Sequence, residues 1–203
     1  MNKQSIIIGI VFISGTLILS TSINFSSGQN STSSTEVIQW KTYTDPEGKF
    51  NINYPADWKI DEIEKTTFDK RDVGFIKKET VDLSGGTSVE QNAAVFGISY
   101  NTDSDMEDVD LEEFVQELSS RNQFNYDNYR EIEGGIDTYK ISGNPAVGII
   151  FANSNGFQEQ GQLNVISFPD DNLFNINYVA DQKNFDKYLP IAEKMIQSIK
   201  IIK

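Results

Sequence analysis

The sequence contains neither cysteine nor histidine in its 203 residues. Without cysteine the chain cannot form disulfides, thiolate metal sites, a cysteine nucleophile or a lipid-modified cysteine. Without histidine it lacks the usual general base near neutral pH and the commonest ligand of transition metals. The sequence also contains neither a Gly-x-Ser-x-Gly nucleophile motif nor a glycine-rich phosphate loop. These absences predict that the protein is not an enzyme and requires no cofactor.

Basic residues are few, since 17 Lys and Arg stand against 30 Asp and Glu, and the formal net charge is −13. Proteins that bind nucleic acid present a basic face to the phosphates. The charge balance therefore predicts that the protein does not bind nucleic acid.

The N-terminal segment resembles an export signal. Lys3 is the only charged residue among the first 35, and an apolar run follows over residues 6–19. A charged start followed by an apolar stretch is typical of a signal peptide. The apolar run is short for a membrane span, which needs about 20 residues. Two alternatives stay open: cleavage after the small residues 26–28, or retention of residues 5–23 as a membrane anchor.

The composition after this segment changes to Ser, Thr and Asn, which bury too little apolar surface to order a chain. We therefore expect residues 1–22 to be a signal peptide or N-terminal membrane anchor and residues 23–36 to be a flexible tether. Residues 37–203 are expected to form one folded domain. The protein is accordingly predicted to be secreted or attached to the cell surface, outside the cytoplasmic membrane.

Turn signals divide residues 37–203 into short strands. Gly and Asn favour tight turns, and hairpins imply antiparallel neighbours. Such turns are expected at residues 45–48, 85–86, 134–135, 155–156 and 169–172. The strands between them are expected over residues 37–43, 50–54, 58–63, 74–79, 93–100, 129–132, 136–141, 146–152, 160–168 and 173–179.

Two amphipathic helices are also predicted. The first follows Asp110 as N-cap, and its apolar residues recur at helical spacing on one face: Leu111, Phe114, Val115 and Leu118. The second is expected to begin at Pro190, because proline lacks an N–H and fits the first turn of a helix.

Three blocks of the sequence resemble the PsbP-like family, which shares the Mog/PsbP-like fold. The resemblance covers roughly residues 38–203. The blocks are Tyr43-x-Asp45-x-x-Gly48-x-Phe50-x-Ile52-x-Tyr54-Pro55-x-x-Trp58, Gly143-Asn144-Pro145-Ala146, and Tyr188-Leu189-Pro190 through Met195-Ile196-x-Ser198-Ile199. Phe50, Tyr54 and Trp58 are interpreted mainly as core aromatic residues.

The resemblance implies an α+β fold in which a central antiparallel sheet carries helices on both faces, an α/β/α sandwich. The hairpin signals agree with this sheet independently. The plant member is an extrinsic photosystem II subunit that helps to retain calcium and chloride, and prokaryotic relatives are exported or surface proteins. The metal-linked histidines of the family have no counterpart here, so the photosynthetic role is not carried over. An acidic exported domain suits an archaeal or a bacterial surface, and composition does not choose between them.

Residues 103–117 contain eight acidic residues and no basic one. Calcium prefers several oxygen ligands, often from alternate carboxylates in a loop. The candidate ligands are Asp103, Asp105, Glu107 and Asp108. The EF-hand pattern nevertheless fails, because its sixth position is not Gly and its twelfth is not Glu. The alternative is a solvated loop leading into a helix whose dipole favours acidic residues in the first turn.

Three aromatic residues, Phe124, Tyr126 and Tyr129, alternate with amide and acidic residues after the first helix. Exposed aromatic rings beside amides could contact a sugar or a partner protein, whereas packing over the edge of the sheet is the alternative.

The leading hypothesis is an exported, non-enzymatic PsbP-like module that binds or assists a protein complex at a membrane surface. The alternative is an exported protein that binds calcium or a small ligand. The third hypothesis is a hydrolase that uses carboxylates alone, and no residue pair in the sequence points to it.

Overall fold

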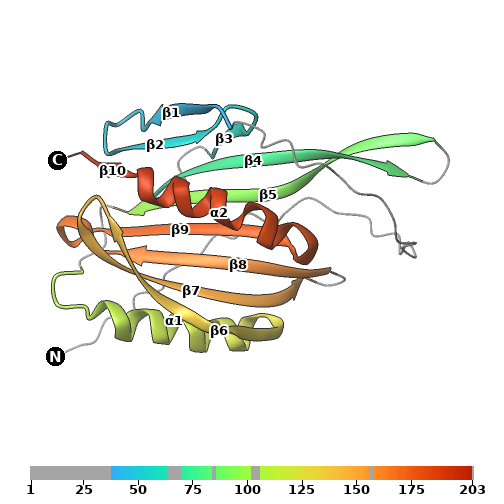
Figure 1. The fold of residues 1–203 in the computed structure, drawn as a ribbon. Coiled ribbons are helices and arrows are strands. Elements are labelled where there is room, and N and C mark those ends of the chain that lie inside the picture. Colours follow the sequence, from blue (N-terminus) through green and yellow to red (C-terminus); the bar gives the residue numbers. More distant parts are fainter. Residues whose placement is uncertain (1–37, 64–69, 84–85, 102–105, 156–157, 203) are drawn as a thin grey trace.

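The structure, a computed structural model, describes residues 38–63, 70–83, 86–101, 106–155 and 158–202. Its strands form a large antiparallel sheet with the order β3-β4-β5-β9-β8-β7-β6 and a small sheet with the order β1-β2-β10 (Figure 1). The strands are β1 (Trp40–Thr44), β2 (Phe50–Pro55), β3 (Lys59–Ile63), β4 (Lys70–Leu83), β5 (Thr87–Asn101), β6 (Asp127–Ile141), β7 (Asn144–Asn155), β8 (Gln158–Ser167), β9 (Leu173–Asp181) and β10 (Lys200–Ile201).

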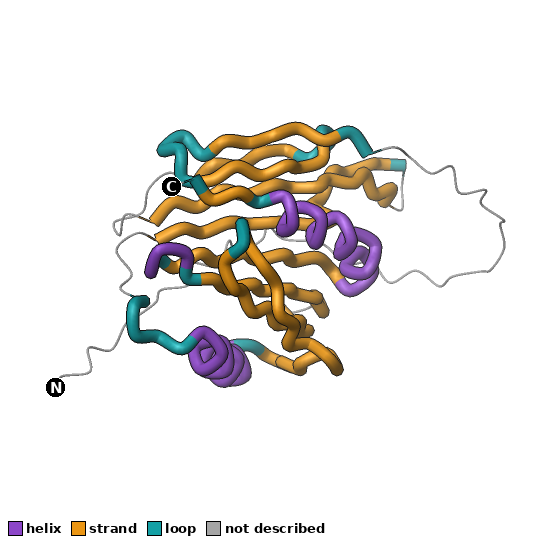
Figure 2. Tube along the Cα trace, turned by 60° about the vertical axis from the view of Figure 1, so that its left-hand side comes forward, coloured by secondary structure: helices purple, strands orange, loops and turns teal. Residues whose placement is uncertain are grey.

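The two α-helices, α1 (Leu111–Asn125) and α2 (Gln182–Ser198), lie on opposite faces of the large sheet (Figure 2). Side chains alternate between these faces along β7. Val147 and Ile149 belong to the apolar cluster under α1, whereas Ala146 and Ile150 belong to the cluster under α2. The predicted α+β sandwich is therefore confirmed. Neither described helix has the length and apolar character required to cross a membrane.

The small sheet covers the same face of the large sheet as α2. The ring centroids of Tyr43 and Phe75 are 5.7 Å apart, and those of Phe50 and Phe174 are 5.6 Å apart. The sequence interpretation of Phe50, Tyr54 and Trp58 as core residues is confirmed, because all three side chains are buried. This apolar packing makes the α2 face the main core of the domain.

Glycine lets α2 approach β8 closely. A Cβ atom at Gly161 would lie 2.4 Å from the ring of Phe185, the first large buried residue of α2. The Tyr178 hydroxyl donates a hydrogen bond to the backbone oxygen of Phe185 at 2.8 Å, which fixes this turn of the helix against β9.

The first predicted helix begins as expected. The Asp110 side chain accepts a hydrogen bond from the backbone N–H of Glu113 at 2.8 Å. The second prediction is wrong at its start, because Pro190 lies inside α2 and not in its first turn. Asp181 supplies the N-cap by accepting from the Asn184 N–H at 2.8 Å. Burial of Phe185 and Tyr188 holds the turns before the proline, and this packing outweighs the missing backbone hydrogen bond.

Most predicted turns are confirmed. In the first turn the Gly48 N–H donates to the Asp45 carbonyl oxygen at 2.7 Å. At the turn of residues 155–156, the pairing of β7 with β8 continues as far as Asn155 opposite Gln158. The hairpin predicted at residues 134–135 is wrong, since β6 is one continuous strand. Both predicted pieces of β6 pair with the same strand β7, and the register shifts between Glu131 and Ile136. The glycine pair therefore accommodates an irregularity and does not reverse the chain.

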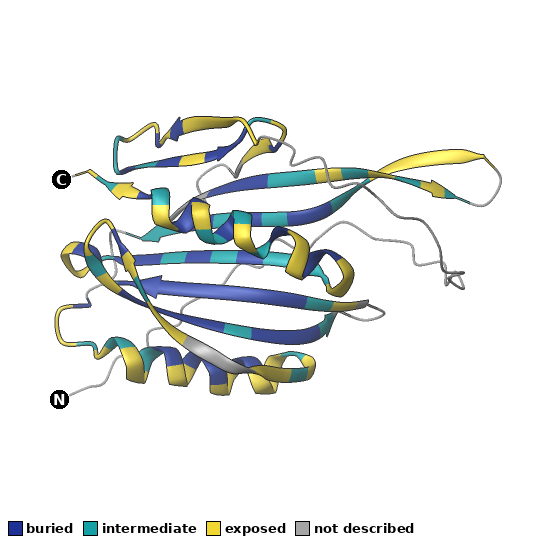
Figure 3. Ribbon diagram, in the orientation of Figure 1, coloured by how far each residue is buried: buried dark blue, intermediate teal, exposed yellow. Residues whose placement is uncertain are grey.

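The strands β4 and β5 extend well beyond the sheet as a twisted two-stranded ribbon (Figure 3). We call residues 78–83 and 86–92 the arm. A register shift between Lys77 and Lys78 marks its base. The arm was only partly predicted, because the expected strands ended at residue 79 and began at residue 93.

Candidate functional site

Five carboxamide side chains lie on the face of the large sheet that α1 partly covers. We call them the amide patch: Asn153 on β7, Gln162 and Asn164 on β8, and Asn175 and Asn177 on β9. The strand register places Asn164 directly opposite Asn177, and Gln162 directly opposite Phe151. Phe151 belongs to the apolar cluster under α1, so the alternation of side chains assigns the patch to this face.

The amide patch is rich in polar atoms that have no partner among the described residues. Asn153, Gln162 and Asn164 are 2%, 3% and 6% exposed, and Asn175 and Asn177 are half-buried. The side-chain oxygen of each of the five residues accepts no hydrogen bond from the part of the chain that the structure describes. A buried polar atom left unpaired costs about 1–3 kcal/mol, so native proteins retain few of them. Such a group on one face makes this a candidate site for a polar ligand, which can reach these oxygens only when the atoms that bury them move.

Two of the predicted aromatic residues border this patch. The rings of Tyr126 and Tyr129 lie 6.1 Å and 5.1 Å from the ring of Phe151. Burial raises the pKa of Tyr126, although the neighbouring Gln162 amide opposes this shift. Both tyrosines therefore pack over the edge of the sheet, which is the structural alternative that the sequence left open.

The hydroxyl of Tyr129 joins a small polar cluster between α1 and β6. It lies 3.1 Å from the Ser119 hydroxyl and donates to a carboxylate oxygen of Glu131 at 3.4 Å. Ser119 also donates a hydrogen bond to Glu131. Burial raises the pKa of Tyr129 and so keeps it neutral. This cluster attaches α1 to β6 and thereby holds one wall of the amide patch in place.

Phe124 differs from the two tyrosines, because its side chain is 92% exposed. It lies in the last turn of α1, two residues before the Tyr126 ring that contacts Phe151. A fully exposed phenylalanine has no structural role in the described fold. Aromatic side chains of this kind are frequent anchors at protein interfaces.

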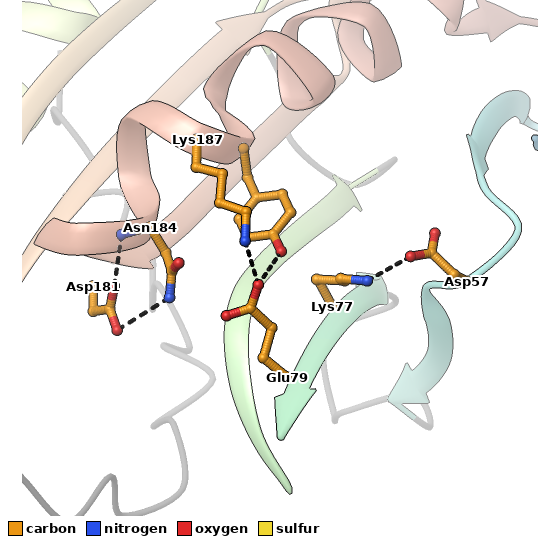
Figure 4. Close-up of polar contacts among 7 residues, drawn as sticks. Asp57, Lys77, Glu79, Asp181, Asn184 and Lys187 are labelled. Atoms are coloured by element: carbon orange, nitrogen blue, oxygen red, sulfur yellow. Dashed lines mark hydrogen bonds and ion pairs between the residues drawn. The ribbon is translucent and has the colours of Figure 1, made fainter. Parts of the chain in front are cut away.

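A second polar group joins the base of the arm to α2 (Figure 4). One oxygen of Glu79 on β4 accepts hydrogen bonds from the Lys187 ammonium and the Tyr188 hydroxyl, each at 2.5 Å. Burial raises the pKa of Glu79, but these hydrogen bonds outweigh it and the net shift is downward. Burial and the Glu79 hydrogen bond raise the pKa of Tyr188 to about 12. These contacts attach the base of the arm to α2.

The predicted calcium ligands are only partly visible. Asp103 and Asp105 lie outside the described residues, and Glu107 and Asp108 are exposed. Over the described ranges no three acidic side chains converge on one point where a metal ion would bind. Calcium binding therefore stays a prediction, which a calcium titration of the Asp103→Asn/Asp105→Asn variant tests.

A small hollow of about 140 Å³ lies between α1 and the strands β6 and β7. It is lined by Glu112, Val115, Gln116, Thr138 and Val147. Sites for small organic ligands usually measure about 300–1,000 Å³. This hollow is therefore small for such a ligand, and the buried amide patch, with its unpaired side-chain oxygens, is the candidate functional site.

Sequence reasoning missed the amide patch. Asparagine at alternate positions of a strand is usual on a solvated face, and the sequence alone does not show that Asn164 and Asn177 meet. The usable signal was in residues 173–179, where both sets of alternating positions contain large apolar residues. Such a strand is covered on both faces, and asparagines within it are then unusual.

No protein-family model matches this chain. No curated protein is similar to it in sequence.

Solved structures are nevertheless similar to the described fold. PsbP of the cyanobacterium Synechocystis has a TM-score of 0.55 and 12% identity, over 85% of this chain and 98% of that chain. The Ran-binding protein Mog1p of Saccharomyces cerevisiae has a TM-score of 0.52 and 10% identity, over 82% of this chain and 97% of that chain. A protein of Bacteroides thetaiotaomicron has a TM-score of 0.52 and 16% identity, and the match spans 82% of this chain and half of that protein. At these identities the likeness shows the fold alone, so the resemblance to PsbP is confirmed at that level.

Proposed function

We propose that the protein is an exported, non-enzymatic binding module that holds an extended segment of a partner protein on its amide patch. The observation that carries this proposal is the set of five side-chain amide oxygens without a partner among the described residues. Export rests on the sequence of the N-terminal segment, and a location at a membrane surface is part of the same proposal.

The spacing of the patch suits a peptide backbone. Gln162 and Asn164 are two residues apart on β8, as are Asn175 and Asn177 on β9. Residues two apart in a strand repeat every ~6.8 Å, which is also the repeat of the peptide groups on one side of an extended chain. Each carboxamide has both donors and an acceptor, and thus matches the N–H and C=O groups of a peptide.

Phe124 supplies an exposed apolar anchor in the last turn of α1, two residues before Tyr126, whose ring lies 6.1 Å from Phe151. An aromatic side chain that a partner buries is a frequent interface hot spot. Mog1p, which shares the fold, is described as a Ran-binding protein, and this supports a protein partner for the present chain by analogy of fold.

The test compares four forms of the full chain, each immobilised and exposed to native membranes solubilised in mild detergent. They are wild type, Phe124→Ala, Asn164→Leu/Asn177→Leu, and Gln123→Ala as the matched control on the exposed side of the same helix. We expect a protein that wild type and the control retain and that the other two variants lose. Retention of the same proteins by all four forms would contradict the proposal.

A further inference from the structure

The arm offers two strand edges that pair with nothing else in the described part of the chain. The pairing of β3 with β4 ends at Ile76, and the pairing of β9 with β5 begins at Ala94. Beyond these points, within the residues that the structure describes, β4 and β5 pair only with each other. An isolated two-stranded ribbon is at best marginally stable in water, and its edges are templates for a further strand.

The outward-facing backbone groups on β4 follow from the turn at the tip. The Leu83 carbonyl oxygen accepts a hydrogen bond from the Gly86 N–H, so the backbone polar groups of Leu83 face β5. The direction alternates along an antiparallel strand. The N–H and C=O groups of Lys78, Thr80 and Asp82 therefore face outward and are available to another strand.

We propose that a second copy of this chain pairs with the outer edge of β4, antiparallel and two-fold symmetric about Thr80. In this register Lys78 of each copy lies opposite Asp82 of the other, so two pairs of opposite charges form across the new ladder. Opposite charges directly across an antiparallel pair are stabilising, and like charges are destabilising. The inference does not depend on the proposed function.

Other registers of the same edge are less favourable. Centring the pair on Lys78, Glu79 or Asp82 places like charges opposite each other, and centring it on Val81 forms no charge pair. The outer edge of β5 is less favourable, because Glu90 is the only charged residue of 86–92 and no register of two copies there forms a pair of opposite charges. Glu90 is already 3.5 Å from Lys59 and 3.7 Å from Lys78.

The arm is held in a fixed direction at its base, which favours association. Glu79 is bound to Lys187 and Tyr188 of α2, and Lys77 lies 2.5 Å from Asp57 (Figure 4). The exposed ribbon in Figure 3 therefore projects from an anchored base, so little freedom is lost when its edge pairs.

Cysteine cross-linking tests the register, because the chain has no cysteine of its own. In the proposed pair the two Thr80 Cα atoms are about 5.5 Å apart, within the range of about 4.4–6.8 Å that a disulfide needs. The matched control is Ser88→Cys on the other strand of the arm, where the two copies would be three strand spacings apart across the sheet and four residues apart along it, a separation of about 20 Å. We expect the full chain with Thr80→Cys to form a disulfide dimer under mild oxidation and Ser88→Cys to remain monomeric. Equal yields from both variants, or no dimer from Thr80→Cys, would overturn the inference.

Exchanging the charges of Lys78 and Asp82 in the same Thr80→Cys background tests whether these charge pairs hold the two copies together. Lys78→Asp and Asp82→Lys each place like charges across the two-fold axis, and we expect each to lower the disulfide yield at least tenfold. The double variant Lys78→Asp/Asp82→Lys restores opposite charges and is expected to restore the yield. Failure of the double variant to recover, with unchanged circular dichroism, would also overturn the inference.

Discussion

At the residue scale, the amides of the fold fall into two groups with different roles. Asn184 is buried and its side chain donates to Asp181 at 3.3 Å, so it belongs to the N-cap of α2. Asn164 is equally buried, but its side-chain oxygen has no partner in the described part of the molecule. The first arrangement stabilises the fold, whereas the second lowers stability, as the proposed binding role predicts.

This difference predicts opposite effects of the same substitution. Replacing an unpaired buried amide by an apolar side chain of similar shape is neutral or stabilising, and removing a paired one costs about 1–3 kcal/mol. We expect Asn164→Leu/Asn177→Leu to leave the free energy of unfolding unchanged or higher, and Asn184→Leu to lower it. Urea unfolding measures both. A large loss of stability in the double variant would show that these amides are structural.

The stability of the fold is expected to depend on pH through the hydrogen bonds that join Glu79 to Lys187 and Tyr188. Glu79 has a lowered pKa, so its contribution is present above its ordinary value of 4.5 and is lost as the pH falls through the folded pKa. The pKa of Tyr188 is raised from 10.0 to about 12, so its contribution is present below pH 10 and is lost between about pH 10 and pH 12. Hydrogen bonding to Glu79 also raises the pKa of Lys187, so the contribution of Lys187 to stability is likewise lost at alkaline pH.

Glu79→Gln isolates the acidic part of this dependence. The difference in the free energy of unfolding between wild type and variant is expected to be constant from about pH 5 to pH 9 and to shrink at lower pH. Urea unfolding at a series of pH values measures it. A difference that stays constant down to pH 3 would show that the Glu79 contacts do not contribute to folding.

At the scale of the elements, the sequence predicted turns and helix starts correctly where a single residue decides the local conformation. The Asp110 N-cap, the Gly48 turn and the Asn155 hairpin depend on interactions within a few residues, and all three are confirmed. The start of α2 and the hairpin at residues 134–135 were predicted wrongly, because long-range packing decides them. Burial of Phe185 and pairing with β7 outweigh the local preferences of Pro190 and the glycines.

The cap of α2 gives a prediction at this scale. Asp181→Ala removes the acceptor for the Asn184 N–H and is expected to cost about 1 kcal/mol of unfolding free energy. Asp181→Asn retains a side-chain acceptor and is the control, with little expected change. Chemical denaturation of the two variants measures the effect, and equal losses in both would show that charge, and not the cap hydrogen bond, matters at this position.

At the scale of the whole molecule, the residues assigned to the proposed binding site are uncharged although the chain is acidic. The chain has a net charge of −13, yet the amide patch and Phe124 contain no charged side chain. Contacts between exposed charges are screened over about 10 Å at 0.1 M salt, whereas amide and apolar contacts are not. We expect the partner to remain bound when NaCl is raised from 50 to 500 mM. Release of the partner by salt would instead place the interface on the acidic surface.

The resemblance to the PsbP-like family implied the fold class, and the locally encoded hairpin signals agreed with its antiparallel sheet. The sequence analysis singled out Tyr126 and Tyr129, which lie beside the candidate site, but missed the amide patch, whose members come from three different strands. Only the pairing of those strands brings Asn164 and Asn177 together. Export and the anchoring of residues 5–23 remain predictions from the N-terminal segment.

The most direct test of the binding face is site-specific photo-cross-linking in living cells. A benzophenone amino acid replaces Phe124, and the matched control replaces Gln197, an exposed residue of α2 on the opposite face. The proposal predicts a discrete cross-linked partner from position 124 that is lost when Asn164→Leu/Asn177→Leu is added, and none from position 197. The same partner from both positions, or from position 197 alone, would contradict the assignment of the binding site to the amide patch.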